Sequence, residues 1–308
     1  MATFRFRALP PAVPRRGIPL REHAGQAAGN WAVPQPERWS KAPQGDPLPH
    51  VKRDGLSLFY EQEGSGDPPL VFIHGWCCDH TFFQPQFAYF KAAHTVTALD
   101  LRGCGRSDRP AGGYDIPTLA DDVAWLCREL RLAKPVVIGH SLGGMIAIEL
   151  AARYPSLPAA VVADDPGAID PLPVAPKVYE GLATQIEGPD GDMVRRAYIE
   201  GMFLASEDID RRRWIADTMC SVPPSIAAAV LRGVVAWNGV GALLLCNVPV
   251  LVLLSDSGGS NAPDRLLALK PGIHFGITVG AGHFHQLEVP EQVTPMIEKF
   301  IQIAVRAA

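Results

Sequence analysis

The segment that most restricts the fold of this chain is residues 135–155, PVVIGHSLGGMIAIELAARYP. A short apolar run at 136–138 meets a serine that has a glycine two positions away on either side, and an apolar stretch with helical spacing follows at 142–153. A strand that passes directly into a helix needs a tight turn, and small residues let the two elements approach. The segment therefore predicts a buried strand, a strained turn at Ser141 and a helix, with the serine hydroxyl raised above the edge of a sheet.

Short apolar runs and helical segments alternate along the rest of the chain from about residue 51. Runs that are apolar throughout indicate strands buried on both faces of a parallel sheet. We therefore expect an α/β fold with a mostly parallel central sheet and helices on both of its faces. The runs typical of strands cover residues 56–61, 70–73, 95–100, 136–138, 159–163, 248–254 and 273–279, and helical spacing occurs at 116–132, 142–153 and 290–305.

Two regions depart from this alternation. Residues 167–246 contain helical patterns but no strand, which predicts a helical cap inserted as a lid between two late strands. The α/β core would then consist of residues 51–166 and 247–308. Residues 1–50 are rich in proline and sustain no apolar period, so we expect an extended or partly disordered arm.

Composition excludes several classes of protein. The net charge of −4 lacks the basic excess of nucleic-acid-binding domains, and no apolar run approaches the length of a membrane span. The basic N-terminal residues lack the apolar stretch of a secretory signal, and the six cysteines show no C-x-x-C spacing. We expect a cytoplasmic protein, a monomer or homodimer, that binds a small molecule and neither nucleic acid nor membrane.

Four motifs resemble those of the α/β-hydrolase superfamily and occur in the same order, over roughly residues 51–308. They are GHSLG at 139–143, a G-x-S-x-G nucleophile elbow; HGW at 74–76, after an apolar run; DLRGCGRSD at 100–108; and AGHF at 281–284, followed by Glu288 and Pro290. The resemblance implies a serine hydrolase in which the backbone amides of Trp76 and Leu142 form an oxyanion hole.

A serine needs a neighbouring base to act as a nucleophile near neutral pH, and histidine has a suitable pKa. His283 follows the last predicted strand and comes after Ser141 in chain order, so it is the expected base. We expect His74 to brace the oxyanion loop and His140 to pack beside the nucleophile, and both to contribute to the substrate pocket. The predicted cap adds Trp214 and Trp237 to that pocket, together with further aromatic residues whose positions the sequence does not separate. No metal or other cofactor is expected.

The carboxylate that orients the histidine is the ambiguous part of the site. Members of the superfamily usually carry it after the strand that follows the cap, where this chain reads LLSDSGG at 253–259, with Asp256 two residues before the expected position. Other members carry it after the preceding strand, where Asp165 stands in VVADDP. Asp165 is the preferred acid and Asp256 the alternate.

These residues predict a serine hydrolase that cleaves a carboxylic ester or lactone of a small, partly apolar substrate through an acyl-enzyme at Ser141. The same apparatus serves C–C bond hydrolases, perhydrolases and lyases in similar proteins, so these remain alternatives. Epoxide hydrolases and haloalkane dehalogenases of this fold carry aspartate at the elbow, which is a serine here. A small-molecule binding protein without turnover is the alternative from a different class.

Overall fold

The residues that the computed structural model describes, 49–171, 174–256 and 261–306, form an eight-stranded sheet. Its strand order is β1-β2-β4-β3-β5-β6-β7-β8, with β1, β2 and β4 antiparallel in succession and all the other neighbours parallel. The mostly parallel sheet is therefore confirmed. The strands are β1 (His50–Arg53), β2 (Leu56–Glu63), β3 (Leu70–Ile73), β4 (Val96–Leu99), β5 (Val136–His140), β6 (Ala160–Asp164), β7 (Val250–Leu254) and β8 (His274–Ile277).

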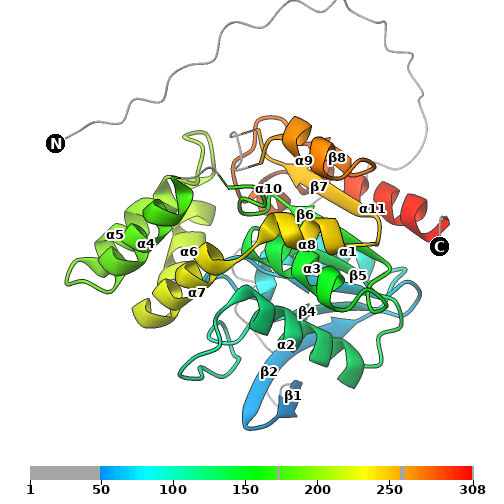
Figure 1. Cartoon of the computed structure of the whole chain (residues 1–308), viewed down its shortest axis with the longest axis horizontal. Coiled ribbons are helices and arrows are strands. Elements are labelled where there is room, and N and C mark those ends of the chain that lie inside the picture. Colours follow the sequence, from blue (N-terminus) through cyan, green and yellow to red (C-terminus); the bar gives the residue numbers. More distant parts are fainter. Residues whose placement is uncertain (1–48, 172–173, 257–260, 307–308) are drawn as a thin grey trace, which may run out of the picture. The chain divides into compact units, whose positions relative to one another are not determined.

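The central strands are apolar throughout because each one supplies two separate layers of the core. In β3, Leu70 and Phe72 belong to one cluster of buried side chains, whereas Val71 and Ile73 belong to the other. Successive side chains of a strand point to opposite faces, so both faces of the sheet must be covered. Helices α1 (Gln84–Phe90) and α11 (Pro290–Arg306) cover one face and α2 (Ile116–Glu129) and α3 (Leu142–Arg153) cover the other, which confirms helices on both sides of the sheet (Figure 1).

The helices outside the sheet differ in length and in what they pack against. Between β6 and β7 the described residues form only helices, of which α4 packs on α5 and α7, and α5 packs on α6. Figure 1 shows α4 to α7 grouped to one side of the sheet, whereas α8 packs on α3. The helices are α1 (Gln84–Phe90), α2 (Ile116–Glu129), α3 (Leu142–Arg153), α4 (Ala175–Ile186), α5 (Gly191–Glu200), α6 (Ile209–Cys220), α7 (Pro224–Ala236), α8 (Gly239–Leu245), α9 (Pro263–Leu269), α10 (His285–Glu288) and α11 (Pro290–Arg306), with a 3₁₀ turn η2 (His80–Phe83).

Two expectations fall at the limits of what is described. Nearly all of the proline-rich arm predicted for residues 1–50 lies outside the described residues. Within the described ranges, no single helix is both long enough and apolar enough to cross a membrane. The helices α6 and α7, which meet at a sharp bend, are long and apolar enough only when they are counted together.

Candidate active site

The turn between β5 and α3 places Ser141 above the carboxyl edge of the sheet. Ser141 has φ 53° and ψ −113°, a strained conformation that non-glycine residues rarely adopt. A Cβ on Gly139 would lie 2.0 Å from the carbonyl oxygen of Gly143, and one on Gly143 would lie 2.1 Å from that of Ile73. The two glycines are therefore needed for the close approach of strand and helix, as the sequence predicts.

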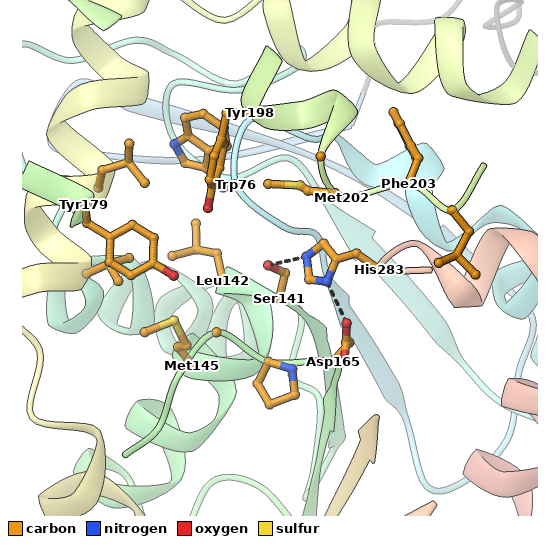
Figure 2. Close-up of a pocket in the computed structure, with 16 residues that line it drawn as sticks. Trp76, Ser141, Leu142, Met145, Asp165, Tyr179, Tyr198, Met202, Phe203 and His283 are labelled. Atoms are coloured by element: carbon orange, nitrogen blue, oxygen red, sulfur yellow. Dashed lines mark hydrogen bonds and ion pairs between the residues drawn. The ribbon is translucent and has the colours of Figure 1, made fainter. Parts of the chain in front are cut away.

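Ser141, His283 and Asp165 form one chain of hydrogen bonds (Figure 2). His283 Nδ1 lies 2.7 Å from Asp165 Oδ2, and Nε2 lies 3.0 Å from Ser141 Oγ. An ionised carboxylate can only accept, so Nδ1 carries a proton and leaves Nε2 free to accept the serine proton. The three residues come from the ends of β5 and β6 and from the loop after β8, which parallel strands bring to the same edge of the sheet.

The surroundings of Asp165 favour its charged form. Ser255, at the end of β7, donates from its backbone amide to Oδ1 and from its hydroxyl to Oδ2, each at 3.0 Å. Burial by itself would raise the pKa of Asp165, but the hydrogen bond and charge of His283, with the other donors, lower the pKa to about 2. Asp256 instead accepts from the Gly280 amide at 3.2 Å. The geometry therefore pairs His283 with Asp165, the preferred acid.

A second histidine–carboxylate pair lies directly behind the first. His285 Nε2 is 2.7 Å from Asp164 Oδ1, and both side chains have 0% exposure. The other ring nitrogen of His285 is 2.9 Å from Thr278 Oγ1. Burial by itself would lower the pKa of His285, but the Asp164 carboxylate outweighs that effect and raises it. This pair joins the end of β6 to the start of α10 without facing the cavity.

The two residues proposed for the oxyanion hole border the same cavity as the serine. Leu142 is the first residue of α3, so its amide has no partner within the helix. Trp76 and Leu142 both border the cavity that contains Ser141 Oγ, as Figure 2 shows. The indole Nε1 of Trp76 donates to the carbonyl of Ala227 in α7 at 2.9 Å, which holds its ring against the helical segment.

A cavity of about 320 Å³ opens above these residues. Its floor comes from the sheet edge and its walls from α4, α5, α7 and the turn after α5. A pocket of this kind, apolar with a few polar groups, is typical of small-molecule sites. Its lining residues are Trp76, Ser141, Leu142, Met145, Asp165, Pro166, Gly167, Tyr179, Tyr198, Gly201, Met202, Phe203, Leu204, Leu231, Val234 and His283.

Four residues expected in the pocket do not line this cavity. His74 is buried behind the oxyanion loop, where Nδ1 donates to the Gly75 carbonyl and Nε2 accepts from the Leu101 amide; it braces the loop but is not part of the pocket. His140 is also fully buried and donates through Nε2 to the His283 carbonyl at 2.8 Å, so it supports the His283 loop from below.

The two predicted pocket tryptophans pack elsewhere. Trp214 of α6 lies against Phe82, with ring centroids 4.9 Å apart. Trp237 donates through Nε1 to Glu149 of α3 at 2.9 Å. The pocket expectation for both was therefore wrong, because helical packing uses large aromatic side chains as readily as a cavity does. The aromatic residues of the segment between β6 and β7 that do reach the cavity are Tyr179, Tyr198 and Phe203.

Several residues of the site were missed from the sequence. Ser255 directly follows the apolar run that ends at Leu254, and its place at the carboxyl end of that strand is the signal that could have indicated a side chain supporting Asp165. Met145 lies one helical turn after Ser141, a spacing that puts it beside the nucleophile. Leu231 and Val234 of α7 carry no signal of their own, because apolar residues at helical spacing also form ordinary helix contacts.

Comparison with known proteins agrees with this fold. A family model described as the alpha/beta hydrolase fold matches residues 68–189. The chain is 42% identical over 100 residues to the AB hydrolase superfamily protein YisY of Bacillus subtilis, which covers 32% of this chain and only 37% of that protein. It is 38% identical over 262 residues to a 2-(acetamidomethylene)succinate hydrolase of Mesorhizobium japonicum, covering 80% of this chain and 92% of that protein.

The fold extends the similarity to solved structures. The solved structure of a thermophilic esterase from Thermogutta terrifontis matches this chain with a TM-score of 0.73 and 26% sequence identity. The match covers 83% of this chain and 97% of the esterase. The order of motifs, the sheet and the long match to a hydrolase lead to one conclusion. The chain belongs to the alpha/beta hydrolase family and is a hydrolase.

Proposed function

We propose that the protein is a serine hydrolase that cleaves a carboxylic ester or lactone, with Ser141 as nucleophile, His283 as general base and Asp165 as the orienting acid. The observation that carries this proposal is the unbroken series of hydrogen bonds from Ser141 Oγ through His283 to Asp165. A buried, ionised acid holds the imidazole in the required tautomer and stabilises the imidazolium that forms when the serine loses its proton. The intact series favours turnover over passive binding.

The proposed reaction runs in two steps. Ser141 Oγ attacks the carbonyl carbon while its proton passes to His283 Nε2, and the negative oxygen accepts hydrogen bonds from the Trp76 and Leu142 amides. His283 then gives that proton to the departing alkoxide, which leaves an acyl group on Ser141. A water molecule, deprotonated by the same ring, attacks the acyl carbon, and the returning proton restores the serine as the acid is released.

The size and lining of the cavity support a small and partly apolar substrate. A volume of about 320 Å³ lies near the lower limit of small-molecule pockets. Esterase and hydrolase are the activities named for the Thermogutta and Mesorhizobium proteins, which supports hydrolysis at a carbonyl carbon. An ester and a lactone present the same carbonyl to the serine, so both remain within the proposal. The helices α4, α5 and α7 would act as the lid over it.

Covalent labelling and turnover test the proposal together. An organophosphonate probe should label the wild type at Ser141, and the purified protein should hydrolyse short aryl esters. Ser141→Ala should lose the label and reduce kcat by about 10⁴-fold or more, because the base has no nucleophile left to activate. Ser57→Ala, a change on β2 outside the cavity, serves as the control. Labelling of the alanine variant, or ester turnover that it retains, would contradict the proposal.

A cytoplasmic location and small-molecule partners stay part of the proposal. The location is supported by the cysteines, because all six are free thiols and five of them are buried.

A further inference from the structure

We propose that the substrate carries an uncharged acyl group with a hydrogen-bond acceptor a few atoms from the scissile carbonyl, and that Tyr179 and Tyr198 recognise this acceptor. The inference rests on the proposed function, since it takes Ser141 as the nucleophile. It names the class of acyl group that the cavity accepts and assigns two specificity-determining residues.

The first argument is the charge inside the cavity. Apart from the two tyrosines, the ionisable side chains of its lining are Asp165 and His283, and these are bonded to each other. Asp165 is buried and stays ionised, because its pKa is lowered to about 2. A carboxylate on the acyl group would enter beside this charge, and no lysine or arginine is among the lining residues to compensate it. Burying an unpaired charge is strongly unfavourable, so the lining selects against anionic acyl groups.

The second argument is a pair of phenol hydroxyls in an otherwise apolar wall. Tyr179 from α4 and Tyr198 from α5 both line the cavity, and Figure 2 shows their hydroxyls directed into it. Burial raises the pKa of both, so both hydroxyls keep their protons at neutral pH. The two hydroxyls hydrogen-bond to each other, so the pair has one O–H left that can donate to a ligand. A donor in an apolar wall favours a ligand that supplies an acceptor.

The third argument is the direction in which the substrate must lie. The departing alkoxide takes its proton from His283, so the leaving group lies on the His283 side of Ser141. In Figure 2 Tyr179 lies on the opposite side of Ser141, beyond Leu142, and Tyr198 lies above Leu142 beside Trp76, whereas Met202 and Phe203 lie above His283. The tyrosines therefore face the acyl group, and the leaving group contacts apolar side chains. The edge-to-face contact of Tyr198 with Trp76, at 5.9 Å between ring centroids, fixes that ring beside the oxyanion loop.

Three ethyl esters of nearly equal size test the inference. Ethyl 4-oxopentanoate carries a neutral acceptor, ethyl pentanoate carries none, and monoethyl succinate carries a carboxylate at the corresponding place. We expect kcat/KM for monoethyl succinate to be at least about 100-fold below that for ethyl 4-oxopentanoate, because its charge is left unpaired. Comparable values for the succinate and 4-oxopentanoate esters would overturn the uncharged class.

Two conservative variants test the tyrosines. In Tyr179→Phe with Tyr198→Phe the rings remain but the donors are gone, so the preference for ethyl 4-oxopentanoate over ethyl pentanoate should fall about tenfold relative to wild type. Tyr154→Phe is the matched control, because its hydroxyl donates to Asp121 on the surface and not into the cavity. An unchanged preference in the double variant would overturn the assignment.

The outcomes separate this inference from the proposed function. If the organophosphonate fails to label Ser141 and none of the three esters is hydrolysed, the hydrolase mechanism itself fails, and this inference with it. If Ser141 is labelled and all three esters are cleaved at similar rates, the mechanism stands and the acyl-group class is wrong.

Discussion

The two histidine–carboxylate pairs of this protein join the same two segments but differ in what surrounds them. His283–Asp165 and His285–Asp164 both connect the end of β6 to the residues after β8, each with a nitrogen–oxygen distance of 2.7 Å. The His283 side chain is 21% exposed and reaches Ser141 Oγ, whereas the side chains of His285 and Asp164 are closed off completely.

The difference shows that pairing alone does not make a catalytic group. Both pairs have short contacts and buried acids, but one ring alone has a nitrogen that faces the cavity. The other pair does not reach the cavity; it holds the β6 end and the His283 loop together, and the charge of His285 also lowers the pKa of Asp165. The two pairs are neighbours in the sequence, and what distinguishes the reactive one is that His283 exposes a ring nitrogen to the cavity.

Removing the charge of Asp165, the acid of the cavity-facing pair, should have the largest effect on activity. Asp165→Asn removes the charge that orients His283, so kcat for ester hydrolysis should fall by about 10³–10⁴-fold. Asp256→Asn is the matched control at the alternate position, where the contact altered among the described residues is the one to the Gly280 amide, and its kcat should stay within about threefold of wild type. Steady-state kinetics of both variants decides the assignment; a larger loss in Asp256→Asn would reverse it.

Breaking the buried pair should instead act on folding. His285→Gln or Asp164→Asn leaves a buried partner uncompensated, which should lower the free energy of unfolding by about 3–5 kcal/mol. Urea denaturation followed by fluorescence measures this change. Where the variants remain folded, organophosphonate labelling of Ser141 should persist, unlike in Asp165→Asn. A variant of this pair with native stability and no labelling would show that both pairs act in catalysis.

The smallest expected effect is a difference between the two pairs in how folding stability depends on pH. Asp165 has a lowered folded-state pKa, so its contribution to stability is present above about pH 4 and disappears as the pH falls towards 2. His285 has a raised folded-state pKa, so its contribution is complete below about pH 6.5 and disappears as the pH rises through the folded-state value. Urea midpoints measured across pH should therefore lose the acid slope in Asp165→Asn and the alkaline slope in His285→Gln. The reverse assignment of slopes would contradict the comparison.

Most of the sheet could be predicted from the sequence because its inner strands are buried on both faces. Strands such as β3 and β7 are apolar throughout, which leaves few other interpretations. β1 was missed because its sequence, HVKR, is mostly polar, as befits an edge strand with one buried residue. The helix α1 was missed because its seven residues, QPQFAYF, are too few to establish a period.

Some residues of the site could be predicted from their neighbours in the sequence, whereas others depend on contacts with distant parts of the chain. Ser141 and His283 lie in motifs whose geometry is set by the neighbouring residues. The choice between Asp165 and Asp256 depends on the positive φ of 41° at Asp165 and on two donors from Ser255, ninety positions further along the chain. Which cap aromatics reach the cavity depends likewise on how whole helices pack, and no local pattern encodes that.

The helical segment between β6 and β7 is tied to the reaction centre by its backbone. The amide of His283 donates to the Met202 carbonyl at 3.3 Å, and the Trp76 indole donates to that of Ala227. A chimera that replaced this segment with the one from a relative would need a carbonyl group in register at both places. The segment and the loops below it are therefore constrained to change together, so this hydrolase would acquire a new specificity more readily by side-chain substitution than by exchange of the whole insert.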